Sequence, residues 1–175
     1  MVEQKINIAL DTYNDLFSDF DISAFQNRSI SLDFKEELES HYLDENLKQL
    51  KIIFSIPKKQ RNVKNEKIII KRLKQFFISK QQNYSKRINL RKQKGFNLII
   101  MGFFFITLTF IFELFFTDWL PLYFSNIIMI LGWFGIWNGF EKVVEVPPEF
   151  LTKKNMYISF SKAEIIFIDE EDIKI

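Results

Sequence analysis

FNLIIMGFFFITLTFIFELFF (Phe96–Phe116) and WLPLYFSNIIMILGWFGIWNGF (Trp119–Phe140) are the two stretches that decide the fold. They are 21 and 22 residues long, and only Thr117 and Asp118 separate them. A helix needs about 20 apolar residues to cross the roughly 30 Å hydrocarbon layer of a membrane. The sequence therefore predicts a two-helix transmembrane hairpin at residues 96–140, with spans at 96–116 and 119–140.

Charge is distributed unevenly along the chain, although the formal net charge is only +2. Residues 1–50 carry 11 acidic and 4 basic side chains, whereas residues 51–95 carry 15 basic side chains and one acid, Glu66. Such a basic block is typical of a segment that binds nucleic acid or lies beside a membrane. Its place before the hairpin favours the membrane. Apart from Tyr84, the basic stretch before the first span lacks the interleaved aromatic residues of a single-strand binder, so we expect no nucleic-acid partner.

The basic residues around the hairpin also predict its orientation. Five of them lie within 15 residues before the first span, none lies between the spans, and three follow the second span within 15 residues. The positive-inside rule then places both termini in the cytoplasm. The five residues before the first span are also candidates for contact with anionic lipid, at about 1 kcal/mol each near the surface. They are Lys86, Arg87, Arg91, Lys92 and Lys94.

The residues before the hairpin predict the larger part of a small α/β module. Lys5–Leu10 and Gln49–Ile56 have the composition and alternation of strands. Between them, a helix is expected to begin near Ser31 or Asp33. A long helix then follows from about Lys64, apolar on one stripe at first and basic toward its end, and it runs into the first span.

After the hairpin, Pro147-Pro148 predict an extended connector. Met156–Phe160 and Ile165–Ile168 then predict a C-terminal β-hairpin. The expected fold is a membrane α+β protein whose elements follow the order β-α-β-α, two spans, β-β. Residues 1–95 form a cytoplasmic module that ends in a basic helical stalk, 96–140 form the hairpin, and 141–175 join the module to complete a sandwich built from both termini.

Glycines mark one face of the second span. Gly132, Gly135 and Gly139 follow one another at i, i+3 and i+7, and the last two form a GxxxG pattern. Small residues at this spacing let another helix backbone approach closely. Either packing against the first span of the same chain or an oligomer contact satisfies the pattern.

Glu113 is the one ionisable residue well inside a span. Intramembrane carboxylates are costly and often functional. Glu113 lies three residues short of the outer end, however, so its side chain needs to extend only a short distance to reach water at the membrane interface. A pore would require a polar stripe along one helix face, and Asn97, Thr107, Thr109 and Glu113 do not share one face cleanly.

Residues for catalysis or ligand binding are not apparent in the sequence. The chain has no cysteine, which excludes disulfides and thiolate metal sites, and its one histidine, His41, cannot build a zinc site without several carboxylates around it. It also lacks a Ser/His/Asp set, a Walker loop and a dinucleotide fingerprint. We expect no catalytic, cofactor-binding or metal-binding residues, and no enzymatic activity.

Two stretches resemble a known family. DISAFQNRSI (Asp21–Ile30) is similar to the D-P-S-P-x-x-x-R-x-L loop, and GWFGIWNGFE (Gly132–Glu141) to the G-W-x-x-x-W-x-P-x-E exit of the second span, of uncharacterised small bacterial inner-membrane proteins with two transmembrane helices. Ile22, Ala24 and Gly139 stand where the family pattern has proline. The resemblance implies a bacterial inner-membrane location and carries over no catalytic residues.

These observations lead to two hypotheses about function. The first is a non-enzymatic inner-membrane protein that tethers a cytoplasmic α/β module, as a scaffold or membrane subunit for a partner protein. Its expected partners are membrane lipid and either another protein or further copies of the chain. The alternative is an oligomeric pore-forming or membrane-disrupting effector.

Overall fold

A computed structural model describes residues 2–42, 47–115 and 122–172 of the chain. Thr117, Asp118 and Trp119, expected at the outer turn, lie outside the described residues. The chain divides into two compact units, an α/β unit formed by Met1–Asn83 with Thr152–Ile175 and a helix-pair unit formed by Tyr84–Leu151. The elements are β1 (Val2–Ala9), η1 (Tyr13–Leu16), α1 (Leu32–Ser40), β2 (Leu47–Ile56), η2 (Lys58–Gln60), α2 (Val63–Phe115), α3 (Leu122–Val144), α4 (Pro148–Lys162), β3 (Glu164–Asp169) and η3 (Glu170–Asp172).

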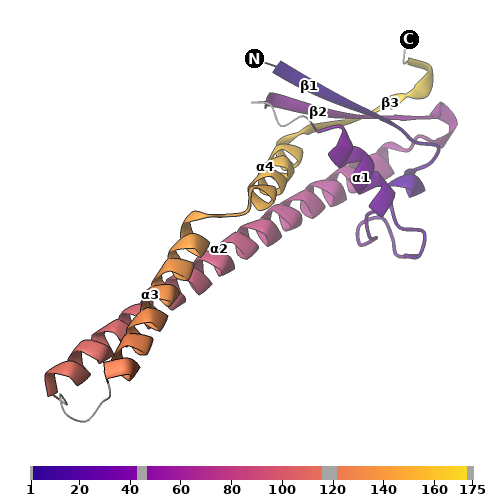
Figure 1. The fold of residues 1–175 in the computed structure, drawn as a ribbon. Helices are drawn as coiled ribbons and strands as arrows, with labels where there is room; N and C mark the ends of the chain where they lie inside the picture. Colours follow the sequence, from indigo (N-terminus) through magenta and orange to yellow (C-terminus); the bar gives the residue numbers. More distant parts are fainter. Residues whose placement is uncertain (1, 43–46, 116–121, 173–175) are drawn as a thin grey trace. The chain divides into compact units, whose positions relative to one another are not determined.

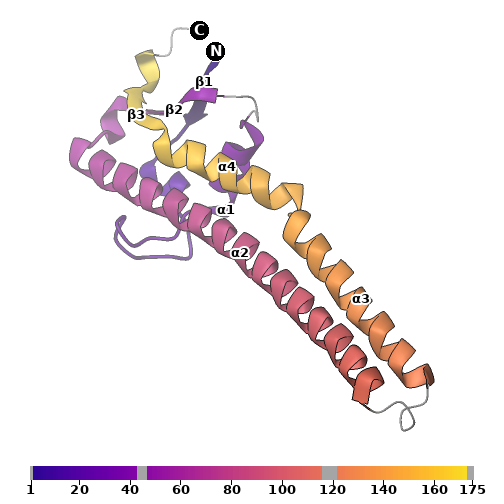
Figure 2. The ribbon, with the colours of Figure 1, turned by 90° about the vertical axis from the view of Figure 1, so that its left-hand side faces the viewer.

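The α/β unit is built on a three-stranded parallel sheet in the order β1-β2-β3. Side chains alternate along each strand, so Ile8 of β1, Phe54 of β2 and Phe167 of β3 align in register and are buried on one face. Within this unit α1, α4 and the first part of α2 lie on the same side of the sheet (Figures 1 and 2). The sheet and these helices form two layers around one core.

Aromatic rings fill that core. The ring of Phe34 in α1 lies 5.9 Å from that of Phe54, and the ring of Phe77 in α2 lies 5.4 Å from that of Phe160 in α4. Ile69, which begins the apolar stripe expected on α2, is fully buried. The stripe at three- and four-residue spacing therefore faces the sheet, as an amphipathic helix requires.

The other face of the sheet is not covered by any helix of this unit among the described residues (Figure 1). Lys5 and Asn7 of β1 are exposed there, and Ile53, Ile166 and Ile168 are partly exposed. Parallel sheets are normally covered on both faces. This uncovered face therefore presents a mixed polar and apolar surface among the described residues.

The expected C-terminal β-hairpin is wrong. Met156–Phe160 lies within α4, and Pro148, expected in an extended connector, is the first residue of that helix. Proline fits the first helical position because its missing N–H needs no partner there and its φ suits a helix. Because Met156 and Phe160 are four residues apart, both reach the core from one helix face. β3 consequently pairs in parallel with β2 instead of turning back on a preceding strand.

The general α+β layout is confirmed, with two long apolar helices and a small sheet. Two helices among the described residues are long and apolar enough to cross a membrane, one in α2 and one that begins in α3 at Phe124. The long basic helix and the first span are one continuous α2, as expected. α3 begins at Leu122, three residues after the predicted start of the second span.

Candidate functional site

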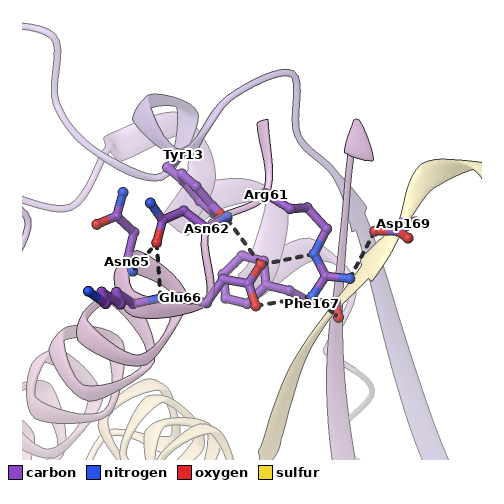
Figure 3. Close-up of polar contacts among 8 residues, drawn as sticks. Tyr13, Arg61, Asn62, Asn65, Glu66, Phe167 and Asp169 are labelled. Carbon is purple, nitrogen blue, oxygen red and sulfur yellow. Dashed lines mark hydrogen bonds and ion pairs between the residues drawn. The ribbon is translucent and has the colours of Figure 1, made fainter. Parts of the chain in front are cut away.

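A polar cluster lies where the three parallel strands end (Figure 3). Arg61 follows β2, and its guanidinium donates to both carboxylate oxygens of Glu66, at 2.9 and 3.1 Å. It also donates to Asp169 at the end of β3, at 2.9 Å, and to the carbonyl of Phe167, at 3.2 Å. The hydroxyl of Tyr13, which follows β1, donates to Glu66 at 3.1 Å. The cluster thus joins the segments that follow or end all three strands.

The environment of this cluster favours a structural role. Hydrogen bonds to Glu66 and Asp169 raise the pKa of Arg61 above its ordinary value, and burial raises the pKa of Tyr13. Glu66 is only 7 % exposed and accepts from both Arg61 and Tyr13. The carboxylates of Glu66 and Asp169 are therefore held by a fixed cation, which leaves neither of them a free general base. Among the described residues no group of three His, Asp or Glu side chains could hold a metal ion.

The residues that carry the family resemblance form a loop that is fastened from within. The carboxylate of Asp21 accepts the backbone N–H of Ser23 at 3.0 Å and that of Ser29 at 2.7 Å. Hydrogen bonds from the side chain and the backbone of Ser23, and then from those of Ser29, lower the pKa of Asp21 well below its usual range. Arg28 donates to the side chain of Asn14 at 2.6 Å and to the carbonyl of Ser18 at 3.3 Å. The Asp and Arg of the motif thus hold the two ends of the loop together.

Two large apolar side chains project from this loop into solvent. Phe20 and Ile22, on either side of Asp21, are both 100 % exposed. Phe25 of the same loop instead stacks on Phe17, with ring centroids 5.4 Å apart. Two adjacent, fully exposed apolar side chains on a fixed loop are candidates for contact with a protein partner. We refer to Ser18–Ser29 as the anchor loop.

The hairpin glycines meet other glycines across the helix pair. A β-carbon built on Gly132 would lie 2.9 Å from the carbonyl oxygen of Gly102, and one built on Gly139 would lie 2.5 Å from that of Gly95. Gly135 faces Gly102 with more space, at 3.4 Å. The three glycines singled out from the sequence therefore pack against α2 of the same chain. The prediction of an oligomer contact stays untested, and such a contact would have to use another face.

A seven-residue repeat of small side chains runs along both helices of this unit, and sequence inspection missed it. Gly95 and Gly102 are followed seven residues on by Thr109, and Gly139 and Gly132 are preceded seven residues back by Ser125. Thr109 and Ser125 are buried, at 1 % and 5 % exposed. A seven-residue spacing keeps one helix face toward a partner helix. Comparing the glycines of both spans at this spacing would have identified the repeat.

Large apolar side chains lie on the outside of the helix pair. Those more than half exposed on α2 include Phe96, Ile100, Phe103, Phe104, Phe110, Leu114 and Phe115, and those on α3 include Phe124, Ile127, Ile130, Leu131, Trp133, Phe134, Trp137 and Phe140. A water-soluble helix pair has the opposite arrangement, with large apolar residues inside. Small residues inside and Phe, Ile and Trp outside suit a hydrocarbon solvent.

The polar residues of α2 do not line a path. Glu113 is exposed on the outside of the helix. The hydroxyls of Thr107 and Thr109 donate to the carbonyls of Phe103 and Phe105 in their own helix, at 2.8 and 3.0 Å. These two threonines are therefore satisfied locally.

The basic stalk separates into two groups. Arg87, Arg91 and Lys94 line an open surface cavity of about 400 Å³ in the helix-pair unit, together with Leu90, Lys142 and Phe150. Lys86 and Lys92 do not line it. The structure thus brings three of the five candidate lipid contacts together with one cation from α3 that was not singled out.

The comparisons with known proteins give no relative: no family model, curated protein or solved structure matches the chain.

Proposed function

We propose that this chain is a non-enzymatic bacterial inner-membrane protein whose hairpin tethers a cytoplasmic α/β module to which a partner protein binds. The main support for this proposal is the distribution of side chains in the helix pair, which has small residues at the helix contact and large apolar residues outside. Buried glycine, threonine and serine lie along its helix contact, and most of its exposed side chains are large and apolar, which is unusual for a surface in water. The basic residues on the flanks of the hairpin support an orientation with both termini in the cytoplasm.

The absence of cysteine makes a clean topology experiment available. Single-cysteine variants are made at Gln93, before the first span, and at Asp118, between the spans. A membrane-impermeant maleimide added to intact spheroplasts is expected to label Asp118→Cys, and to label Gln93→Cys only after lysis. The reverse pattern would overturn the orientation. Recovery of the wild-type chain in the soluble fraction would overturn the membrane anchor.

The anchor loop supports the partner-binding role. The hydrogen bonds of Asp21 and Arg28 fix the loop that carries Phe20 and Ile22, so a partner that binds these side chains pays less to order the loop backbone. The uncovered face of the sheet is a second surface for the same role.

Site-specific photo-crosslinking in intact cells tests this role. A photoreactive residue at Phe20 is expected to give a discrete cross-linked species containing a second polypeptide. The same residue at Glu36, exposed on α1, is the matched control and is expected to give none. If no cross-linked species forms at Phe20 in repeated trials, or if Phe20 and Glu36 capture polypeptides equally, the result would count against partner binding by the anchor loop.

The pore-forming effector remains the alternative. It would need a polar path, and no observation among the described residues favours one, because Thr107 and Thr109 bond to their own helix and the glycines face inward. Dye leakage from liposomes that carry the purified chain at high density separates the two functions. Liposomes that keep their dye support the membrane-tethering function, and leakage that increases with protein density supports the pore.

A further inference from the structure

The cavity in the helix-pair unit combines four cationic side chains with a mainly apolar lining. Four of the six described residues that line it are cations, Arg87, Arg91, Lys94 and Lys142, and none is a carboxylate. Like charges around one cavity repel each other, and the repulsion is relieved when an anion enters. The cavity therefore favours a negatively charged occupant.

Local contacts place these cations. Arg87, Arg91 and Lys94 lie on one face of α2, because they are spaced at i, i+4 and i+7. Arg91 Nε donates to the backbone carbonyl of Glu145 at 3.2 Å, and the guanidinium of Arg87 lies 5.8 Å from the centre of the Tyr84 ring. Both arginines are thus oriented before any ligand binds.

Glycine contact brings the fourth cation to the cavity. A β-carbon built on Gly95 would lie 3.0 Å from the β-carbon of Lys142, so α2 and α3 are in close contact beside Lys94. A larger residue at position 95 would separate Lys142 from the arginines of α2. The glycine pair that closes the helix pair thus also assembles the cavity.

The remaining lining residues indicate what kind of anion fits. Leu90 and Phe150 give the cavity two apolar walls, and the apolar surface of α2 begins two residues beyond Lys94, at Phe96. A headgroup phosphate with an attached glycerol and acyl chain matches a cationic cavity that adjoins an apolar surface. A free phosphate would leave the apolar walls without a partner.

We infer that Arg87, Arg91, Lys94 and Lys142 form a discrete site for the phosphate of an anionic phospholipid. The inference rests on the membrane location proposed above and narrows the expected lipid contacts. Lys142 belongs to the site, whereas Lys86 and Lys92 contribute only diffuse surface charge.

Lipid retention by the purified full-length chain, measured by native mass spectrometry, tests the site. The protein is extracted from liposomes of equal phosphatidylglycerol and phosphatidylcholine. Wild type is expected to retain one phosphatidylglycerol in preference to phosphatidylcholine. Arg91→Gln with Lys142→Gln is expected to weaken retention on the order of 25-fold, since each basic residue contributes about a fivefold factor. Lys86→Gln with Lys92→Gln removes the same charge outside the cavity and is expected to match wild type.

Three further measurements make the result decisive. The charge-preserving pair Arg91→Lys with Lys142→Arg is expected to restore most of the retention. Lys94→Gln alone, expected to weaken retention about fivefold, serves if the double variant does not fold. Millimolar inorganic phosphate is expected not to displace the lipid, and displacement would overturn the lipid assignment.

Two results would overturn the site while leaving the anchor intact: equal effects of the two glutamine pairs, or equal retention of phosphatidylcholine. A wild-type chain that does not insert into liposomes at all would instead contradict the proposed function.

Discussion

Gly139 of α3 lies against the backbone of Gly95 in α2, so that a β-carbon on Gly139 would stand 2.5 Å from the Gly95 carbonyl oxygen. The obstacle is backbone, which cannot move aside without separating the helices. Gly139→Ala is therefore expected to destabilise the helix pair by about 1–3 kcal/mol, the usual cost of overpacking. Unfolding in mixed detergent micelles measures the change.

Gly135→Ala is the matched control, because its β-carbon would meet its nearest neighbours at 3.4 Å, an ordinary contact. Alanine also favours a helix over glycine by up to about 1 kcal/mol. This variant is expected to be neutral or slightly more stable. A loss equal to that of Gly139→Ala would contradict the packing described for the pair.

Arg61→Leu would leave the carboxylate of Glu66 buried without its cation. Removing one partner of a buried ion pair typically costs about 3–5 kcal/mol. Because Arg61 is partly exposed, we expect Arg61→Leu to lower the free energy of unfolding by about 3 kcal/mol, at the lower end of this range, as measured by chemical denaturation. Lys51→Met, which removes the more exposed pair with Glu164, is expected to cost less than about 1 kcal/mol. Similar losses of unfolding free energy in Arg61→Leu and Lys51→Met would contradict the structural role of the polar cluster around Arg61 and Glu66.

Tyr13 makes stability depend on alkaline pH. Burial raises its pKa above the ordinary value of 10.0. Its contribution is therefore complete below pH 10.0 and is lost as the pH rises through the higher folded-state value, because the unfolded state ionises first. Tyr13→Phe is expected to lower stability near neutral pH by about 1 kcal/mol and to flatten the decline above pH 10 relative to wild type. Parallel pH curves for the two proteins would contradict this assignment.

Asp21 makes the anchor loop sensitive to acid. Its pKa lies below the ordinary value of 3.8 because hydrogen bonds from the side chain and the amide of Ser23, and then from Ser29, stabilise the charged form. The stabilisation is therefore present above pH 3.8 and is lost as the pH falls through the lower folded-state value. Asp21→Asn is expected to speed hydrogen exchange at the amides of Ser23 and Ser29 at neutral pH. Exchange at Leu16, buried before the loop, is the control and is expected to stay unchanged.

Phe20 and Ile22 are expected to contribute little to the stability of the fold. Both are fully exposed, so Phe20→Ser with Ile22→Ser is expected to change the free energy of unfolding by less than about 0.5 kcal/mol. Phe25→Ser, which removes the stacking on Phe17, is expected to cost about 1 kcal/mol or more. A large loss from the Phe20 and Ile22 pair would indicate a packing role in place of a docking role.

Much of the fold was readable because it follows local periodicity. β2 and α2 lie where hydrophobic spacing placed them, and the two long apolar helices follow from length and composition. α4 was misread because five residues, Met156–Phe160, hold both a strand pattern and a helical i, i+4 pair. Pro148 was taken as a helix breaker although it is well suited to the first helical position.

The polar cluster and the lipid cavity could not be read from sequence, because each joins residues distant in the chain. Arg61 and Asp169 come together only through the parallel pairing of β2 with β3. Lys142 joins Arg91 only through the glycine contact of α2 with α3. Glu66 gave a hint of the polar cluster in the sequence, because it is the single acid in a segment with 15 basic residues. Such an isolated acid suggests a position where a negative charge is needed.

β3 follows the helix pair in the chain and completes the described sheet by pairing with β2, whose other edge pairs with β1. Until β3 is synthesised, β2 has an unpaired edge, and the apolar side chains of Ile52 and Phe54 lack their neighbours Ile165 and Phe167. The entire helix pair is translated during that interval. Chains that stall before residue 164 lack β3, so we expect the edge of β2 and its apolar side chains to be open to other chains and to proteases until residues 164–169 have been made.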